Sequence, residues 1–428
     1  MRQINTETEF KEFQKILNNR SVGYSKEIVD TVIEIINDIK NNGDDALIKY
    51  TQKYDRNNSD SIKISQDTIN KYAQKVDPAF MDALRISADR IRDFHARQKE
   101  QSWQIEKDGA ILGQIIRPLN RVGVYVPGGK AAYPSTVLMN VIPAQVAGVN
   151  EIALCVPTPD GIINPHVMAA IKMLGIKEVY AVGGAQAVAA LAYGTETIKP
   201  VDKIVGPGNI YVAIAKKMVF GVVDIDMIAG PSEVLIIADD KADPRFIAAD
   251  LLSQAEHDEM ASSILISTSM DIITQTNTEI ELQLKQLHKK EIAQKSLDDF
   301  GALIYVDSLE MAFEYSNSIA PEHLEIMTEE PMDKLPMIKN AGAIFLGKWT
   351  PEPLGDYSAG PNHTLPTGGS ARFFSPLGVY DFIKRSSLLY FTEQGFRDLA
   401  PIVEKIADVE GLNGHANSIK IRRDSFLS

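Results

Sequence analysis

Four of the seven histidines lie near side chains that can bind a metal or move a proton. Gln254 and His257 are three residues apart at the end of an expected helix, so an amide and an imidazole share one helical face. Asp356 and His363 lie in a segment rich in proline and glycine, and His415 lies near the C-terminus. Two imidazoles with oxygen ligands suit zinc or a similar divalent cation. Spacing alone leaves open the commoner alternative of a helix-end histidine and solvated loop carboxylates.

The adjacent residues Glu322 and His323 form a second candidate site. They follow Pro321, and because proline is favoured in the first turn of a helix, the pattern predicts a helix start here. Neighbouring helical residues diverge by about 100°, so both side chains reach one site only if they flank it. A carboxyl group and an imidazole so placed can perform general acid–base catalysis. The alternative is a solvated helix end.

Two glycine-rich turns connect an expected strand to an expected helix. Gly183-Gly184 precedes a helix over 185–193, and Gly206-Pro207-Gly208-Asn209 precedes a helix over 210–219. Glycines let the backbone approach a phosphate, and the free N–H groups of the following helix attract an anion. Neither turn has the G-x-G-x-x-G spacing of dinucleotide-binding proteins. The turns alone therefore leave open both nucleotide binding and plain strand-to-helix connections.

The elements that must position these residues follow an α/β pattern from about residue 111 to 345. Strands are expected at 122–126, 151–156, 178–182, 203–205, 234–238, 264–267 and 303–306. A strand, a short turn and a helix in repetition indicate parallel α/β layers, and the chain is long enough for two sheets. The first hundred residues are mostly helical in pattern, and helix returns around 401–410. Between them, the long segment 349–378 is expected to be a functional loop.

Composition and charge exclude several classes of function. The 428 residues carry 44 Lys and Arg against 57 Asp and Glu, a net charge of −13 that argues against non-specific nucleic-acid binding. No apolar run approaches the ~18 residues of a membrane span, and the polar start lacks the apolar core of a signal peptide. The one cysteine, Cys155, is expected to be buried in a strand and fits a reducing compartment. We therefore expect a soluble cytoplasmic protein that binds neither nucleic acid nor a membrane.

Several longer blocks together resemble the histidinol dehydrogenase family, in that family's order. The blocks lie at 121–129, 183–187, 205–209, 228–233, 254–257, 320–324, 360–368 and 411–416. The resemblance implies an enzyme that oxidises L-histidinol through bound L-histidinal to L-histidine, the last step of histidine biosynthesis, with two NAD reduced. It also implies one zinc ion per subunit and a homodimer with shared active sites.

The resemblance implies roles for individual residues of this chain. The implied zinc ligands are Gln254, His257, Asp356 and His415. The implied acid–base residues are Glu322 and His323. The implied substrate contacts are Ser232, His323, Glu410 and the four zinc ligands, with His363 as a further candidate. The implied NAD contacts are Tyr125, Gln186 and Asn209.

These roles are chemically coherent. A neutral His323 can take the hydroxyl proton near pH 7 while hydride leaves the alcohol carbon. Glu322 can activate the water that adds to the aldehyde before the second hydride transfer. Zinc would serve chiefly as a template that holds the substrate. Cys155 is not required as a nucleophile.

The fold that the resemblance implies is α/β, with two incomplete Rossmann-like parallel-sheet domains, one inserted in the other, and small helical ends. The expected parts are a helical arm 1–24, a larger domain 25–124 and 232–377, an inserted NAD-binding domain 125–231, and a C-terminal helical segment 378–428 that reaches the partner subunit. Two alternative functions stay open: a paralogous NAD-dependent alcohol dehydrogenase for another small hydroxylated substrate, and a non-catalytic metal- or nucleotide-binding protein on this fold.

Overall fold

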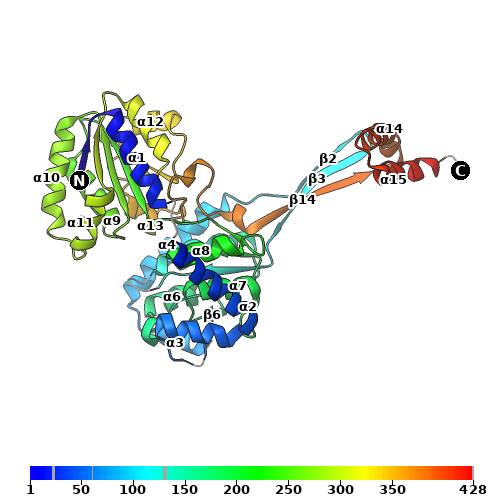
Figure 1. Ribbon diagram of the computed structural model, residues 1–428, viewed down its shortest axis with the longest axis horizontal. Helices are drawn as coiled ribbons and strands as arrows, with labels where there is room; N and C mark the ends of the chain where they lie inside the picture. Colours follow the sequence, from blue (N-terminus) through cyan, green and yellow to red (C-terminus); the bar gives the residue numbers. More distant parts are fainter. Residues whose placement is uncertain (22–24, 60, 129–132, 427–428) are drawn as a thin grey trace. The chain divides into compact units, whose positions relative to one another are not determined.

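The computed structural model describes residues 1–21, 25–59, 61–128 and 133–426. The chain forms two compact units (Figure 1): Met1–Gln98 with Leu119–Phe382, and Lys99–Pro118 with Ile383–Ser428. No helix in the described ranges is long and apolar enough to cross a membrane.

The first unit contains two sheets in which every strand pair is parallel. The six-stranded sheet has the order β1(Arg2–Ile4), β11(Ala302–Tyr305), β10(Ser262–Ser267), β9(Glu233–Ala238), β12(His323–Met327), β13(Ala343–Leu346). The five-stranded sheet has the order β6(Glu178–Tyr180), β5(Glu151–Cys155), β4(Arg121–Tyr125), β7(Lys203–Val205), β8(Asp224–Ile225). Their central strands are short apolar runs because parallel sheets are covered on both faces.

The two sheets share one winding scheme. Both β11-β10-β9-β12-β13 and β6-β5-β4-β7-β8 read 3-2-1-4-5 when their strands are numbered along the chain. In each sheet, strands 2 and 3 are added on one side of the first strand and strands 4 and 5 on its other side. The point where the order of addition reverses is the topological switch point of doubly wound folds. This arrangement confirms the predicted pair of Rossmann-like sheets.

Helices cover both faces of the six-stranded sheet. On one face lie α1(Glu7–Ser21) and α12(Leu309–Ile319), whose apolar side chains pack on β9, β10 and β11. On the other face lie α9(Pro244–Ala255), α10(Met270–Leu284) and α11(Lys290–Phe300). Figure 1 shows α10 and α11 along one side of this sheet and α1 across the other.

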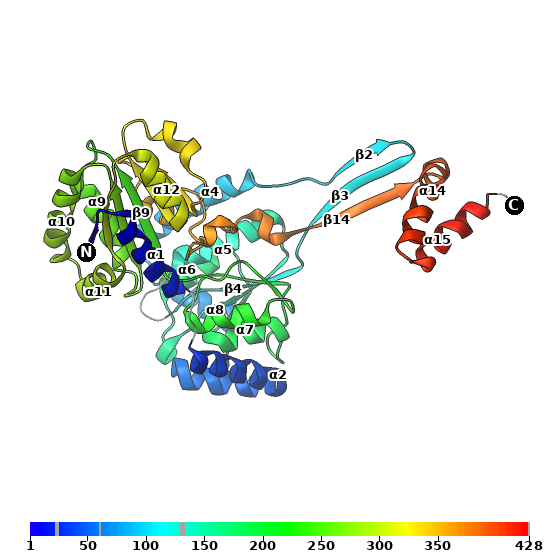
Figure 2. The same cartoon turned by 45° about the horizontal axis from the view of Figure 1, so that its top comes forward.

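The five-stranded sheet is covered in the same way. One face packs against α3(Gln66–Ala73), α4(Pro78–Ala96), α5(Pro134–Ala147) and α6(Pro165–Met173). The other packs against α2(Lys26–Asp55), α7(Gly184–Tyr193) and α8(Ile210–Val219). Helix α2 lies beside α7 (Figure 2), and α3 beside α6, although the expected domain boundaries group α2 and α3 with the larger domain. The boundaries themselves stay a prediction.

The second unit is an antiparallel sheet followed by two helices. Its order is β14(Ile383–Phe391), β3(Ala110–Pro118), β2(Trp103–Lys107), and α14(Glu393–Val409) packs on α15(Asn413–Asp424). The expected helix at 401–410 is confirmed, whereas the sheet is absent from the sequence-based expectation. Strands β2 and β14 are largely exposed, so they lack the alternation of apolar and polar residues that marks a half-buried strand.

The seven expected strands are all present, with ends that differ by at most two residues. The long segment 349–378 is not all loop, because it contains α13(Glu352–Tyr357). Short 3₁₀ turns complete the fold at Pro159–Gly161, Pro331–Met337, Ser370–Arg372 and Val379–Phe382. Cys155 is buried in β5, as expected.

Candidate active site

Most of the predicted catalytic and metal-binding side chains of the first unit meet at the amino ends of β9 and β12. Glu322 and His323 stand at the start of β12, and α13 carries Asp356. Gln254 lies in the last turn of α9, which leads back to the same edge of the sheet. Ligand sites of doubly wound sheets ordinarily lie at the carboxyl ends of the strands. This cluster therefore occupies the opposite edge.

The predicted helix start at Pro321 is wrong. Helix α12 ends at Ile319, its C-cap residue Ala320 has a left-handed φ of 53°, and the chain then turns directly into β12. Proline fits this turn because it fixes its own φ and needs no N–H partner. The acid and base therefore begin a buried strand instead of a solvated helix.

One residue, Glu233 at the start of β9, holds both side chains through its backbone N–H and C=O. The backbone N–H of Glu233 donates to Glu322 Oε2 at 2.8 Å, and the backbone C=O of Glu233 lies 2.9 Å from His323 Nδ1. A carbonyl oxygen only accepts, so His323 Nδ1 must carry a proton. In the neutral ring the lone pair is then at Nε2.

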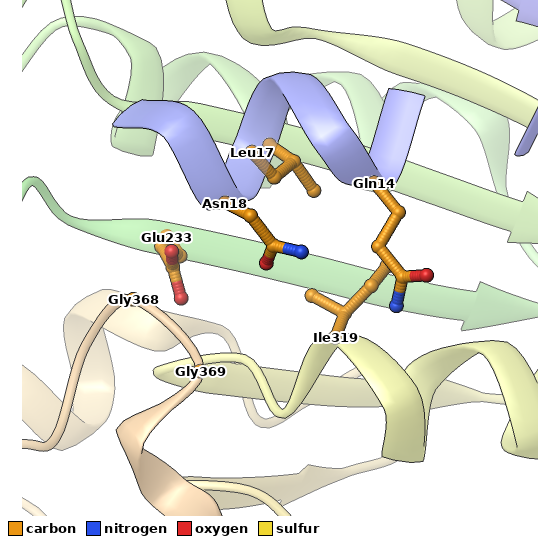
Figure 3. A pocket seen from close by; sticks show the side chains of 7 residues that line it. All are labelled: Gln14, Leu17, Asn18, Glu233, Ile319, Gly368 and Gly369. Carbon is orange, nitrogen blue, oxygen red and sulfur yellow. The ribbon is translucent and has the colours of Figure 1, made fainter. Parts of the chain in front are cut away.

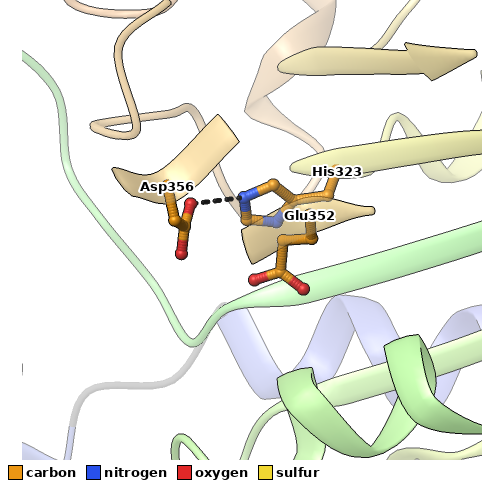
Figure 4. Close-up of side chains that lie close together, drawn as sticks. All are labelled: His323, Glu352 and Asp356. Atoms are coloured by element: carbon orange, nitrogen blue, oxygen red, sulfur yellow. Dashed lines mark ion pairs between the residues drawn. The ribbon is translucent and has the colours of Figure 1, made fainter. Parts of the chain in front are cut away.

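His323 Nε2 faces the carboxylate of Asp356 (Figure 4), 3.7 Å from its Oδ1. The atom is buried and makes no hydrogen bond to any part of the chain that the structure describes. A buried nitrogen without a partner is costly unless a ligand completes it. Its position fits a base that meets substrate.

Charges around His323 set its protonation. Burial alone would lower its pKa, but the carboxylates of Glu352, Glu322 and Asp356 outweigh burial and hold the pKa well above its ordinary value. This direction differs from the expectation of a neutral ring near pH 7, because three carboxylates surround the imidazole. Burial raises the pKa of Glu322 to about 8, although His323 opposes the shift. Both groups are thus strongly perturbed, as is typical of active sites.

Three ligand atoms from His323, Glu352 and Asp356 lie within 4.8 Å of one another, which is close enough to hold one cation. This set shares only Asp356 with the predicted zinc ligands. The Gln254 amide lies 3.3 Å from His257 Nδ1, and hydrogen bonding directs its nitrogen to Glu352 and its oxygen to the imidazole. The predicted ligands of this unit therefore adjoin the cluster.

Two further predicted substrate contacts, His363 and Ser232, hydrogen-bond to the backbone or through it. His363 Nδ1 lies 3.0 Å from the backbone oxygen of Asp356, and its Nε2 lies 3.4 Å from Thr136 Oγ1. Ser232 immediately precedes Glu233, and its carbonyl accepts from the Ser262 N–H at 3.0 Å. His363 therefore supports the end of α13.

Three further buried carboxyl groups, those of Asp250, Glu325 and Glu352, are absent from the site predicted from the sequence. Burial and the neighbouring Asp250 carboxylate hold the pKa of Glu325 well above its ordinary value. Burial raises the pKa of Asp250 to about 6 and that of Glu352 to about 7. Glu325 is two residues beyond His323 in β12, so an alternating strand pattern would have indicated it.

The predicted NAD contacts lie at the carboxyl ends of the five-stranded sheet. Tyr125 ends β4 and its hydroxyl accepts from the Gly184 N–H at 3.1 Å. Gln186 is buried in α7, and its Nε2 has no partner within the described ranges. Asn209 caps α8 and accepts from the N–H groups of the first turn. This edge is the switch point at which dinucleotides bind in such folds.

A buried ion pair holds the turn between β7 and α8. Lys216 Nζ donates to the Gly206 carbonyl at 3.0 Å and pairs with Asp226. The Asp226 carboxylate also accepts from the Gly206 N–H at 2.8 Å. Gly206 has a φ of 109°, and a Cβ there would lie 2.1 Å from the Tyr125 carbonyl oxygen. The turn therefore requires glycine at this position.

Two predicted residues, Glu410 and His415, belong to the second unit. Glu410 ends α14 and His415 lies in the first turn of α15, where both are exposed. The first unit therefore contributes three of the four predicted zinc ligands.

Comparison with known proteins agrees with these observations. A family model described as histidinol dehydrogenase matches residues 18–423. The histidinol dehydrogenase of Clostridium acetobutylicum is 54% identical over 414 residues, covering 96% of each chain, and that of Aquifex aeolicus is 56% identical over 401 residues, covering 93% of each. The crystal structure of the Elizabethkingia anophelis histidinol dehydrogenase matches with a TM-score of 0.94 and 41% identity, over 100% of this chain and 99% of that one. This chain therefore belongs to the histidinol dehydrogenase family and is an oxidoreductase.

Proposed function

We propose that this enzyme oxidises L-histidinol through bound L-histidinal to L-histidine in the cytoplasm, with two NAD reduced and zinc bound at the site. The observation that carries the proposal is the joint support of Glu322 and His323 by the backbone N–H and C=O of Glu233. A binding protein has no need to hold an acid and a base on the backbone of one residue. An oxidation of an alcohol and then of an aldehyde hydrate needs both.

His323 acts on the alcohol proton. Its Nδ1–H is held by the Glu233 carbonyl, so the ring keeps one orientation and presents Nε2 to the substrate. A cation on Asp356 would offset one of the charges that raise the pKa of His323, which favours the neutral ring that a base requires. A nicotinamide cofactor, when bound, supplies the hydride acceptor.

Glu322 serves the second oxidation. One of its oxygens is held by the Glu233 N–H, and the other is left to meet the water that adds to the aldehyde. A pKa of about 8 lets this carboxyl exchange a proton near neutral pH. The base for water addition and the base for the alcohol are thus adjacent residues with separate tasks.

The zinc ligands in this proposal are Gln254, His257 and Asp356, with His415 as the fourth. The donor set of amide oxygen, imidazole nitrogen and carboxylate fits a borderline cation. The Gln254 amide already turns its oxygen away from Glu352, as a ligand would require. When bound, zinc supplies a template for the amine and imidazole of the substrate. Ser232 and Glu410 complete the proposed substrate contacts.

Tyr125, Gln186 and Asn209 are the proposed NAD contacts. They are supported by their place at the carboxyl ends of β4, β6 and β7 and by the unpartnered amide of Gln186.

We further propose a homodimer in which the C-terminal segment completes the partner's site. The support is an exposed apolar face on α14 formed by Leu399, Ile402, Val403, Ile406 and Val409. Such a patch on a soluble helix marks an interaction surface. Glu410 follows directly and His415 begins the next helix, so a partner that covers this face would meet both side chains. An Ile406→Asp variant should therefore sediment as a monomer, whereas a dimer that survives the change contradicts this surface.

Glu322→Gln tests the proposed chemistry. We expect this variant, mixed with L-histidinol and NAD, to release at most one NADH per site in a rapid phase and then to stall. The matched control is Glu310→Gln, an exposed carboxylate in the first turn of α12 that should leave turnover unchanged. Full turnover by Glu322→Gln, with two NADH per histidine, would contradict the assignment. Turnover of another alcohol but not of histidinol by the unaltered enzyme would favour the paralogue.

A further inference from the structure

We propose that Arg20 of α1 is a positioning residue for Glu322 and His323, acting through its ion pair with Glu233. The inference rests on the proposed function, because that function gives Glu322 and His323 the acid–base role. The Arg20 guanidinium pairs with the Glu233 carboxylate, and their side chains are only 0% and 8% exposed. Arg20 Nη1 also donates to the Met260 carbonyl at 2.7 Å. A helix far from the site in sequence thus contacts the residue that holds both catalytic groups.

The backbone at Glu233 needs this support. Glu233 pairs with Ser262 of β10 on one side, but pairing with β12 on the other side begins only at Val234, opposite His323. In place of a strand partner, the Glu233 N–H donates to the Glu322 side chain and the Glu233 C=O accepts from the His323 ring. A shift of this one residue would therefore move Glu322 Oε2 and His323 Nδ1 together.

The surroundings make the ion pair hard to replace with water. Figure 3 shows the Glu233 side chain facing a small pocket between α1, which contributes Asn18, and the turn at Gly368 and Gly369. The pocket has a volume of about 10 Å³, roughly the space for one water molecule. A carboxylate at this place keeps its position only while a fixed cation balances it. Arg20 supplies that cation, and its planar guanidinium reaches Glu233 and Met260 at once.

Arg20 itself does not contact the acid–base pair in any hydrogen bond or ion pair of the described residues. Its expected effect is therefore on the chemical step. Supporting residues one contact removed from an active group change activity by about 10–100-fold in metal sites, and we expect a similar fall in kcat here for Arg20→Met. The KM for L-histidinol and the affinity for NAD should change less than about threefold, because Arg20 is buried against Glu233 and Met260 and is not among the proposed substrate or NAD contacts.

The control for a merely structural effect is Arg245→Met. Arg245 also pairs with a carboxylate of the first unit, Asp243, but the pair is at the surface. This variant should keep the full kcat. Arg20→Lys keeps the charge but lacks the fork, so it should recover part of the activity that Arg20→Met loses.

The deciding measurement is a double-substitution cycle. Arg20→Met is compared in the unaltered enzyme and in a His323→Gln background, with folding checked by circular dichroism. If Arg20 acts through the acid–base pair, its replacement lowers kcat in the first case and has little further effect in the second. An equal fold-change in both backgrounds, or an unchanged kcat in folded Arg20→Met, overturns the inference. If Arg20→Met does not fold, the same cycle with Arg20→Lys decides. A lack of histidinol turnover by the unaltered enzyme would instead refute the proposed function.

Discussion

Lys216→Met should strongly destabilise the first unit. Lys216 is 2% exposed and its partner Asp226 is 1% exposed, so the substitution leaves a carboxylate buried without its cation. Breaking a buried pair in this way costs about 3–5 kcal/mol. The lost hydrogen bond to the Gly206 carbonyl lies within that figure. At about 2–4 °C per kcal/mol for a domain of this size, the thermal midpoint should fall by about 6–20 °C.

The assay is thermal unfolding of the holoenzyme followed by circular dichroism, with two comparison variants. Lys172→Met, an exposed lysine in α6 on the same sheet, should change stability by less than about 0.5 kcal/mol. Lys216→Met combined with Asp226→Asn removes the unbalanced charge and keeps an oxygen for the Gly206 N–H, although its amide nitrogen then faces the Met227 N–H, so it should recover part of the loss. A midpoint for Lys216→Met within 2 °C of the unaltered enzyme, or no recovery in the double variant, would refute this reasoning.

Three further predictions concern other buried groups. Arg121 lowers the pKa of Glu178 to about 2, so Glu178→Gln should lower the free energy of unfolding by about 1–2 kcal/mol at pH 7. This difference in stability between the variant and the unaltered enzyme should be complete above pH 4.5 and disappear as the pH falls toward 2. Unfolding measured across this pH range tests it. Gly206→Ala should cost at least about 2 kcal/mol and weaken NAD binding in a fluorescence titration, because its Cβ would strike the Tyr125 carbonyl at a φ that favours glycine. Cys155 should resist thiol reagents until urea unfolds the chain, because burial raises the pKa of its thiol, and rapid labelling of the native enzyme would contradict its placement.

The parallel sheets could be predicted because their strands are buried on both faces. Such strands are continuous apolar runs, and runs such as 151–156 and 234–238 stand out from their polar surroundings. The helices that follow Gly183 and Asn209 could also be predicted, since glycine and asparagine at those positions mark a helix start. The local sequence was therefore sufficient to predict these strands and helices.

The second unit could not be predicted from local pattern. Strand β14 pairs with β3 across more than 250 residues of sequence, and most of its side chains are exposed. A strand of this kind carries neither an apolar run nor a clear alternation. Its existence depends on a partner that only the folded chain brings near.

The sequence singled out candidate residues for the site but did not predict how the fold arranges them. Pro321 is compatible with either a helix start or a turn into a strand. The left-handed conformation of Ala320, the residue after α12, produces the turn. Glu352 was missed because it is brought to His323 by a short helix inside a segment without periodicity. The cluster also lies at the amino ends of the strands, whereas the general rule for doubly wound sheets predicts ligand sites at the carboxyl ends.

We propose above all that this site carries out two successive oxidations of L-histidinol with NAD and zinc. The most direct test measures NADH at 340 nm and L-histidine in the same reaction, before chelation, after chelation and after zinc is restored. We predict two NADH per histidine, loss of turnover on chelation and recovery with zinc. One NADH per product molecule, or undiminished turnover in the chelated enzyme, would contradict the account.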